Sequence, residues 1–192
     1  TSSPNEMVQF HALQLLYQIK SHDRLGITKL VAQYSQKAAD SFRSPFALVL
    51  LVRYTAKLLT EEVQDGRHQG SYQEASNPTV KSAMGFLEAS LRHKSEIVVY
   101  EAARSICNLP GVGPQDLNGA VSTLQLFLSS TKPATRFGAV RTLAAVANAH
   151  PRAVSKCNED LEALLQDANR NIATLAITTL LKTGSENSIE RL

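Results

Sequence analysis

The histidines are the first residues to consider for metal binding or acid-base chemistry, and they are scattered along the chain. None forms an i, i+4 pair and none has a carboxylate at a metal-binding interval: His11, His22, His68, His93 and His150. A zinc or other transition-metal site needs several such side chains to converge. The histidine pattern therefore predicts no metal centre.

Two cysteines, Cys107 and Cys157, lie far apart in apolar or helical stretches of sequence. Their spacing fits neither a disulfide framework nor a set of metal ligands, which favours a reducing, cytosolic compartment. Cys107 follows Ile106 within a helical pattern, and no histidine with an orienting partner accompanies it. A buried structural thiol is therefore favoured over a nucleophile.

Two further stretches could imitate catalytic motifs. The acidic cluster Glu159, Asp160 and Glu162 could act as paired carboxylates, but acids at a helix start are what the helix dipole favours. The GVGP stretch at 111–114 lacks the Lys-Ser or Lys-Thr and the flanking strand of a phosphate-binding loop, so we expect a turn between helices. Because no polar residues converge, we expect neither an enzyme nor a bound cofactor.

The composition favours a folded, all-helical protein. Hydrophobic residues make up 43% of the chain and aromatic residues only 6%, without Trp, and Ala and Leu dominate, which suits close packing of helices better than strands. The net charge of +3 comes from 20 basic and 17 acidic residues mixed along the chain. This even mixture argues against a nucleic-acid-binding surface.

The chain also lacks the signals of a membrane or secreted protein. Its longest apolar run, at 46–52, is far shorter than the roughly 20 residues that a membrane span needs. It begins at Thr1 without Met, a basic leader or an apolar signal core. We therefore expect a piece of a longer cytosolic protein.

A repeat organises the sequence. Three segments align without gaps at starts 37 residues apart: YEAARSICNL from Tyr100, FGAVRTLAAV from Phe137 and TLAITTLLKT from Thr174. Each has Ala at its third place and Leu or Ile four residues later, on the same face of a helix. Extended backwards, the pattern predicts five helices, here called B helices, marked by Ala12, Ala47, Ala102, Ala139 and Ala176.

A second set of amphipathic stretches, here called A helices, alternates with the first and falls at 25–39, 79–92, 117–129 and 153–166. Pro45 and Pro133 are expected at helix starts and Gly184 at a helix stop. The longer interval between Ala47 and Ala102 indicates an inserted, exposed and mobile loop at about 65–77. These features predict one all-α, HEAT or armadillo-type α-solenoid segment over 1–192.

The residue two places after each recurring Ala should point away from the core of its helical hairpin, forming a ladder of Gln14, Val49, Arg104, Arg141 and Thr178. Arginine at a repeated, outward position favours a protein-binding surface, although simple solubility explains it as well. A basic turn between an A and a B helix could contact acidic lipid or a partner, or could merely be solvated. The candidate partner-binding residues are Arg53, Arg92, Lys94, Arg104, Arg141 and Lys182.

The local sequence goes beyond a generic repeat. Four stretches resemble the trunk of the coatomer gamma subunit family: HALQLLYQIKSHDRL from His11, RHKSEIVVYEAARSI from Arg92, LQLFLSSTKPATRFGAVRTL from Leu124 and NRNIATLAITTLLKTGSENSIERL from Asn169. The last is the most specific, because a generic HEAT repeat does not dictate its polar residues. The related adaptor-complex large subunits are the nearest alternative.

The resemblance implies a non-enzymatic scaffold in the coat of vesicles that bud from Golgi membranes. Its implied partners are a zeta-type small subunit, an Arf-family GTPase in its GTP form and other coatomer subunits, with peripheral membrane association through the complex. The family has no catalytic residues to carry over. Other HEAT-repeat scaffolds, such as nuclear transport receptors or phosphatase scaffolds, should show acidic inner helices, which this sequence does not show.

Overall fold

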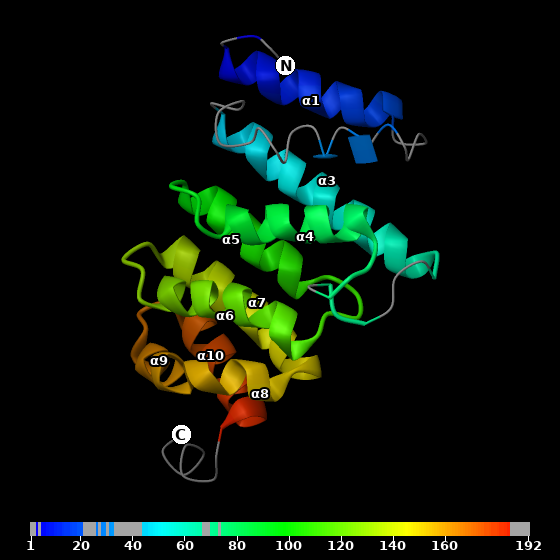
Figure 1. The fold of residues 1–192 in the computed structure, drawn as a ribbon. Coiled ribbons are helices and arrows are strands. Elements are labelled where there is room, and N and C mark those ends of the chain that lie inside the picture. The colour runs from blue at the N-terminus through cyan, green and yellow to red at the C-terminus, as the bar shows by residue number, and fades with distance from the viewer. Residues whose placement is uncertain are drawn as a thin grey trace. The chain divides into compact units, whose positions relative to one another are not determined.

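The computed structural model describes residues 3, 5–20, 26, 28–29, 31–32, 44–66, 70–72 and 74–184. Every regular element in these ranges is a helix, which confirms the predicted all-α class (Figure 1). In chain order the elements, with η for short 3₁₀ helices, are α1 (Glu6–Lys20), α3 (Pro45–Gln64), α4 (Pro78–Ser90), α5 (Glu96–Cys107), α6 (Pro114–Leu128), α7 (Pro133–Ala149), α8 (Pro151–Val154), η1 (Ser155–Cys157), α9 (Asn158–Ala163), η2 (Leu164–Gln166) and α10 (Arg170–Thr183).

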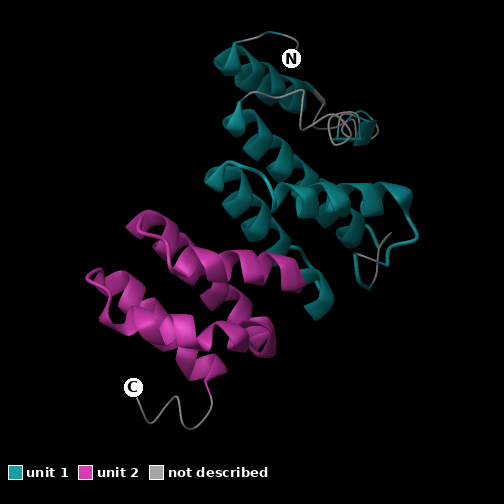
Figure 2. Ribbon diagram, turned by 60° about the vertical axis from the view of Figure 1, so that its left-hand side comes forward, with its two compact units in different colours: residues 1–116 teal, residues 117–192 magenta. Residues whose placement is uncertain are grey.

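The chain divides into two compact units, residues 1–116 and 117–192 (Figure 2). In the first unit α3 packs against α1, α4 and α5. In the second unit α10 packs against α7 and against the short helices between them. The expectation of one continuous segment over 1–192 stays a prediction.

Prolines begin five of the described α-helices. They occupy the first position of α3, α4, α6, α7 and α8, where the missing backbone N–H has no partner within the helix to lose. Pro45 and Pro133 were expected there. Each follows a residue in extended conformation, Ser44 at φ −83°, ψ 116° and Lys132 at φ −86°, ψ 114°. The helices therefore start where the sequence predicts.

The recurring alanines form the core, with one exception. Four are fully buried at 0% exposure, and so are the Leu or Ile residues four places later: Ala47, Leu51, Ala102, Ile106, Ala139, Leu143, Ala176 and Leu180. Ala12 is only half-buried, and its neighbour Leu13 is fully buried instead. The prediction for Ala12 was wrong by one residue. Among the described helices α1 contacts chiefly α3.

The A helices follow the prediction less evenly. The stretches expected at 79–92 and 117–129 are α4 and α6, whereas the stretch expected at 25–39 falls largely outside the described residues. The last, at 153–166, is not one helix but α8, η1, α9 and η2 in succession. Its buried side chains keep a helical spacing of three or four residues all the same: Val154, Cys157, Leu161 and Leu164.

The inserted loop contains a buried anchor. Tyr72 is fully buried at 0% exposure, so the prediction of an exposed loop at 65–77 was wrong for this residue. Its hydroxyl donates to the Pro110 carbonyl at 2.6 Å, and burial of the phenol, with the charge of Asp116 second, raises its pKa to about 12. The buried Asp116 carboxylate accepts from the Ser71 hydroxyl at 2.9 Å and from the Gly113 N–H at 3.0 Å. Pro110, in the turn after α5, and Asp116, in the first turn of α6, therefore hold the described part of the loop in place.

Replacing Ala139 by leucine should destabilise the second unit. Ala139 has no exposed surface, so three added carbon atoms must displace its neighbours, at a cost of about 1–3 kcal/mol. Chemical denaturation should show this loss. Ala145→Leu, at an exposed position of the same helix, is the matched control and should change stability little. Equal effects of the two substitutions would contradict the packing register.

Tyr72→Ala should release the loop and lower the free energy of unfolding by about 3–5 kcal/mol, as for other buried aromatic rings. Tyr72→Phe, which removes only the hydroxyl bonded to Pro110, should lower it by about 0.5–1.5 kcal/mol. Urea denaturation of both variants measures the two contributions. A Tyr72→Ala variant as stable as Tyr72→Phe would mean that the ring is not an anchor.

Candidate protein-interaction site

Two of the predicted partner-binding arginines meet on one carboxylate. Because α3 packs against α5, Arg53 and Arg104 both reach Glu101. Arg53 donates from Nε to Oε1 at 2.7 Å and from Nη2 to Oε2 at 3.3 Å. Arg104 donates from Nη2 to Oε1 at 2.6 Å and from Nε to Oε2 at 3.3 Å. Both ion pairs are bidentate, which is the strongest geometry for an arginine and a carboxylate. We name these three residues the Glu101 cluster.

The Glu101 cluster is buried at its centre and open at its edges. The Glu101 side chain is 6% exposed, while those of Arg53 and Arg104 are 53% and 40% exposed. Burial by itself would raise the pKa of Glu101, but the hydrogen bonds from Arg53 and Arg104 outweigh it and hold this pKa below its ordinary value. The carboxylate is therefore ionised at neutral pH, and the two guanidinium groups extend from it towards solvent.

A shallow pocket of about 180 Å³ opens beside the cluster between α3 and α5. It is lined by both arginines together with Ala56, Lys57, Thr60, Ser105, Asn108 and Leu109. Lys57 lies 5.2 Å from the ring centre of Tyr17, which stacks on Tyr54 with 3.7 Å between ring centres. Three basic side chains therefore border one small pocket of the first unit.

Sequence reasoning located the arginines but not their shared carboxylate. Glu101 and Arg104 stand three residues apart on one helix, a spacing that does predict an ion pair. Arg53 is 48 residues from Glu101, and only the packing of α3 on α5 brings them together.

The remaining two predicted residues of the B helices lie in the second unit. Arg141 is exposed on α7. Lys182 is exposed on α10, and its ammonium donates to the Asn148 side-chain oxygen on α7 at 2.6 Å. Of the other ladder positions Gln14 and Thr178 are exposed and Val49 is half-buried. A single ladder through all five B helices stays a prediction.

Arg92 and Lys94 are exposed in the turn between α4 and α5, as expected. The histidine between them has a structural role, because His93 Nδ1 accepts the Ser95 N–H at 3.0 Å. The same contact recurs 37 and 74 residues later, where Ser130 Oγ accepts the Lys132 N–H and Asp167 Oδ1 accepts the Asn169 N–H. The repeat therefore extends from the helices into the turns that connect them.

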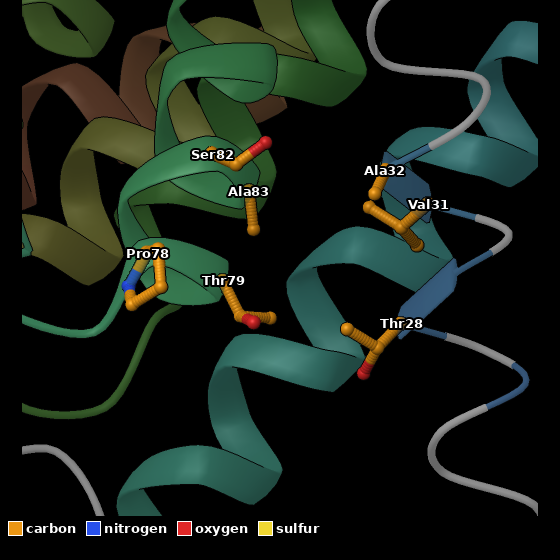
Figure 3. Close-up of a pocket in the computed structure, with 7 residues that line it drawn as sticks. All are labelled: Thr28, Val31, Ala32, Pro78, Thr79, Ser82 and Ala83. Carbon is orange, nitrogen blue, oxygen red and sulfur yellow. The ribbon is translucent and has the colours of Figure 1, made fainter.

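A second pocket is an uncharged packing gap. Figure 3 shows four α4 residues across from three residues of the segment before α3: Pro78, Thr79, Ser82 and Ala83, and Thr28, Val31 and Ala32. None of these side chains can titrate or bind a metal strongly. The pocket offers small apolar groups and hydroxyls only, so we assign it no chemistry.

Metal ligands, membrane-spanning helices and reactive thiols can be looked for among the described residues. No group of three or more His, Cys, Asp or Glu in this part of the chain could hold a metal ion. No helix within it is long and apolar enough to cross a membrane. Burial raises the pKa of the Cys107 thiol to about 12 and that of Cys157 to about 11, so both stay protonated at neutral pH. Cys157 is buried, whereas Cys107, which was predicted to be buried, is only half-buried.

His93 should make stability depend on pH. Burial first, and the charge of Lys94 second, lower its pKa, and protonation of Nδ1 would also break the bond from Ser95. The unfolded chain therefore binds this proton more readily than the folded chain, so stability should fall as pH drops through the ordinary value of about 6.5. The measurement is urea denaturation at pH 7.5 and pH 5.

His93→Asn is the informative variant, because an asparagine side chain can still accept the Ser95 N–H, as Asn77 accepts that of Thr79 at 2.9 Å. It should lose less stability between pH 7.5 and pH 5 than the parent chain does. His11→Asn, at an exposed position, is the control and should follow the parent. If the stability of His93→Asn depends on pH as that of the parent does, His93 is not the group that causes the pH dependence.

Comparison with known proteins places the chain in a family. The family described as the adaptin N terminal region matches residues 1–192. The coatomer subunit gamma of Arabidopsis thaliana is 50% identical over 190 residues, which cover 99% of this chain and 20% of that protein. Coatomer subunit gamma-1 of Homo sapiens is also 50% identical, over 191 residues that cover all of this chain and 20% of that protein. The chain thus spans about a fifth of the relatives it matches.

Two solved structures support the fold alone. An engineered protein superposes with a TM-score of 0.56 at 18% identity, covering 96% of this chain and 46% of that one. A chain from a structure described as "TOG-tubulin binding specificity promotes microtubule dynamics and mitotic spindle formation" superposes with a TM-score of 0.55 at 9% identity, covering 98% and 71%. Together with a helical repeat built on buried alanines, the match over all 192 residues shows that this chain belongs to the adaptin N-terminal-region family of HEAT or armadillo-type proteins.

Proposed function

We propose that this chain is part of the scaffold of a vesicle-coat subunit of the coatomer gamma type, and that it works by binding other proteins and not by catalysis. The observation that carries the proposal is 50% identity to coatomer gamma subunits over nearly the whole chain, in relatives as distant as a plant and a mammal.

The contacts of three acidic side chains support a scaffold function. Glu101 joins α3 to α5, and Asp116 holds the inserted loop. Asp167 accepts from Arg136 Nε at 2.8 Å and so ties α7 to the turn before α10. Each of these carboxylates stabilises a junction between elements. An active site would instead leave such groups open to a substrate.

We further propose that the partners are other coat subunits, a zeta-type small subunit and an Arf-family GTPase in its GTP form. Through them the protein would associate peripherally with Golgi membranes. The basic side chains of the B helices are the proposed contacts, because arginine is enriched among residues that dominate binding energy. Charge of one sign also speeds association with an oppositely charged partner. The adaptor-complex large subunits remain the second candidate, since the matching family is described as the adaptin N terminal region.

A binding experiment with the immobilised chain tests this function. The probes are GTP-loaded Arf, GDP-loaded Arf, the zeta-type coatomer subunit and the small subunits of an adaptor complex. We expect retention of the zeta-type subunit or of GTP-loaded Arf in preference to the GDP-loaded form. Retention of the adaptor subunits alone would favour the second candidate, and retention of none would contradict a binding role for this part of the chain.

The substitutions for that experiment should reverse exposed charges that do not pair with a buried acid. Arg104→Glu would place a second carboxylate beside the buried Glu101 and would disturb the fold. Arg141→Glu with Lys182→Glu avoids this, because both residues are exposed and neither pairs with a buried acid among the residues that the structure describes. We expect this double variant to bind the retained partner about tenfold more weakly, with an unchanged circular dichroism spectrum.

Arg152→Glu is the matched control, since it reverses an exposed charge on α8, an A helix. It should leave affinity unchanged. Equal affinity of the parent and the double variant would remove Arg141 and Lys182 from the interface.

A further inference from the structure

We infer that the pocket between α3 and α5 binds the carboxylate of a glutamate or aspartate side chain from a protein partner. The inference rests on the proposed function in one respect: it assumes that the B helices of the first unit face a protein. It goes further by naming the chemical group that the pocket receives and the atoms that receive it.

The donors are already in place. Arg53 and Arg104 each use Nε and Nη2 on Glu101, and within the described part of the chain neither Nη1 makes a hydrogen bond. Both side chains line the pocket, and both are about half exposed. Two Nη1 groups of guanidinium ions are therefore open to a ligand at one pocket.

The charge around the pocket suits a single carboxylate. Three basic side chains are present, and two carboxylates offset them: Glu101 lies on the two arginines, and Glu61 lies 3.9 Å from the Lys57 ammonium. One net positive charge remains. A carboxylate of charge −1 balances it, whereas a phosphomonoester of about −1.5 to −2 would leave an excess of negative charge beside a buried acid.

The rest of the lining suits a short side chain. Ala56 and Leu109 are apolar and can cover the methylene groups of Glu or Asp, while Asn108 is exposed and has an amide that can donate to a carboxylate oxygen. The Thr60 hydroxyl donates to the Ala56 carbonyl within α3, so it is not a further donor. The volume of about 180 Å³ admits a side chain and not a folded element.

Preorganisation favours binding at this position. A free arginine loses much side-chain entropy when it is fixed. Here the buried Glu101 already holds both guanidinium groups by two hydrogen bonds each, so less freedom remains to be lost when a ligand arrives.

Nuclear magnetic resonance with short peptides tests the pocket. The probes are acetyl-Ala-Glu-Ala-amide, its glutamine counterpart and its phosphoserine counterpart, added to the ¹⁵N-labelled chain. We expect the glutamate peptide to shift the Nε–H signals of Arg53 and Arg104 and the side-chain amide signal of Asn108, with saturation. The glutamine peptide should shift none of them. The inference would be overturned if the glutamate and glutamine peptides caused equal shifts, or if the glutamate peptide caused no saturable shift. Tighter binding of the phosphoserine peptide than of the glutamate peptide would overturn it as well.

Substitutions make the test specific. Arg53→Gln and Arg104→Gln should each weaken binding of the glutamate peptide by about three- to tenfold, the range for partly exposed ionic contacts. Lys57 pairs with Glu61 and not with the buried Glu101, so Lys57→Gln should weaken peptide binding without disturbing the fold. Lys81→Gln, at an exposed lysine of α4, is the matched control and should bind as the parent does. Parent-like binding by Lys57→Gln and by both arginine variants would overturn the proposed site.

The two proposals fail separately. If the peptide binds as expected but no coat protein is retained, the pocket stands and the coat function does not. If coat proteins are retained but the glutamate peptide causes no saturable shift, the coat function stands and the pocket proposal is wrong.

Discussion

Close approach of helices at a buried alanine is the constraint on which the rest of this structure depends. Ala47 and Ala102 are fully buried in the first unit, and Ala139 and Ala176 in the second. A methyl side chain at this position lets neighbouring helices come close, and the Leu or Ile one turn later fills the space beside it. From Ala102 to Ala176 this packing recurs every 37 residues, so other positions of these repeats follow the same register.

The register shows which residue types recur in each repeat and which do not. A buried hydroxyl follows the alanine by three residues in each of the three ungapped repeats: Ser105, Thr142 and Thr179. The turn contacts of His93, Ser130 and Asp167 obey the same interval. By contrast, the positions that correspond to Glu101 are Gly138 and Leu175. The repeat therefore does not require a buried acid here, and the Glu101 cluster is a local feature of α3 and α5.

Most of the fold could be predicted from the sequence because it follows from local patterns. The proline starts at Pro45 and Pro133 and the buried partners of four recurring alanines all depend on residues within one or two turns. The exceptions depend on tertiary contacts. Nothing local distinguishes Tyr72 from an exposed loop residue, because the carbonyl that its hydroxyl contacts belongs to Pro110, 38 residues away. Arg53 and Glu101 likewise meet only because α3 packs on α5.

The central claim is that the B helices of this chain bind another coat protein through their basic side chains. Photo-crosslinking within the intact coat tests it most directly, with a photoreactive amino acid in place of Lys57 on α3 or, as the comparison, of Ala89 on the A helix α4; both positions are exposed. The account predicts a crosslink from position 57 to another coat subunit or to the GTPase, and a much weaker one from position 89. Crosslinking from position 89 alone, or from neither position, would contradict it.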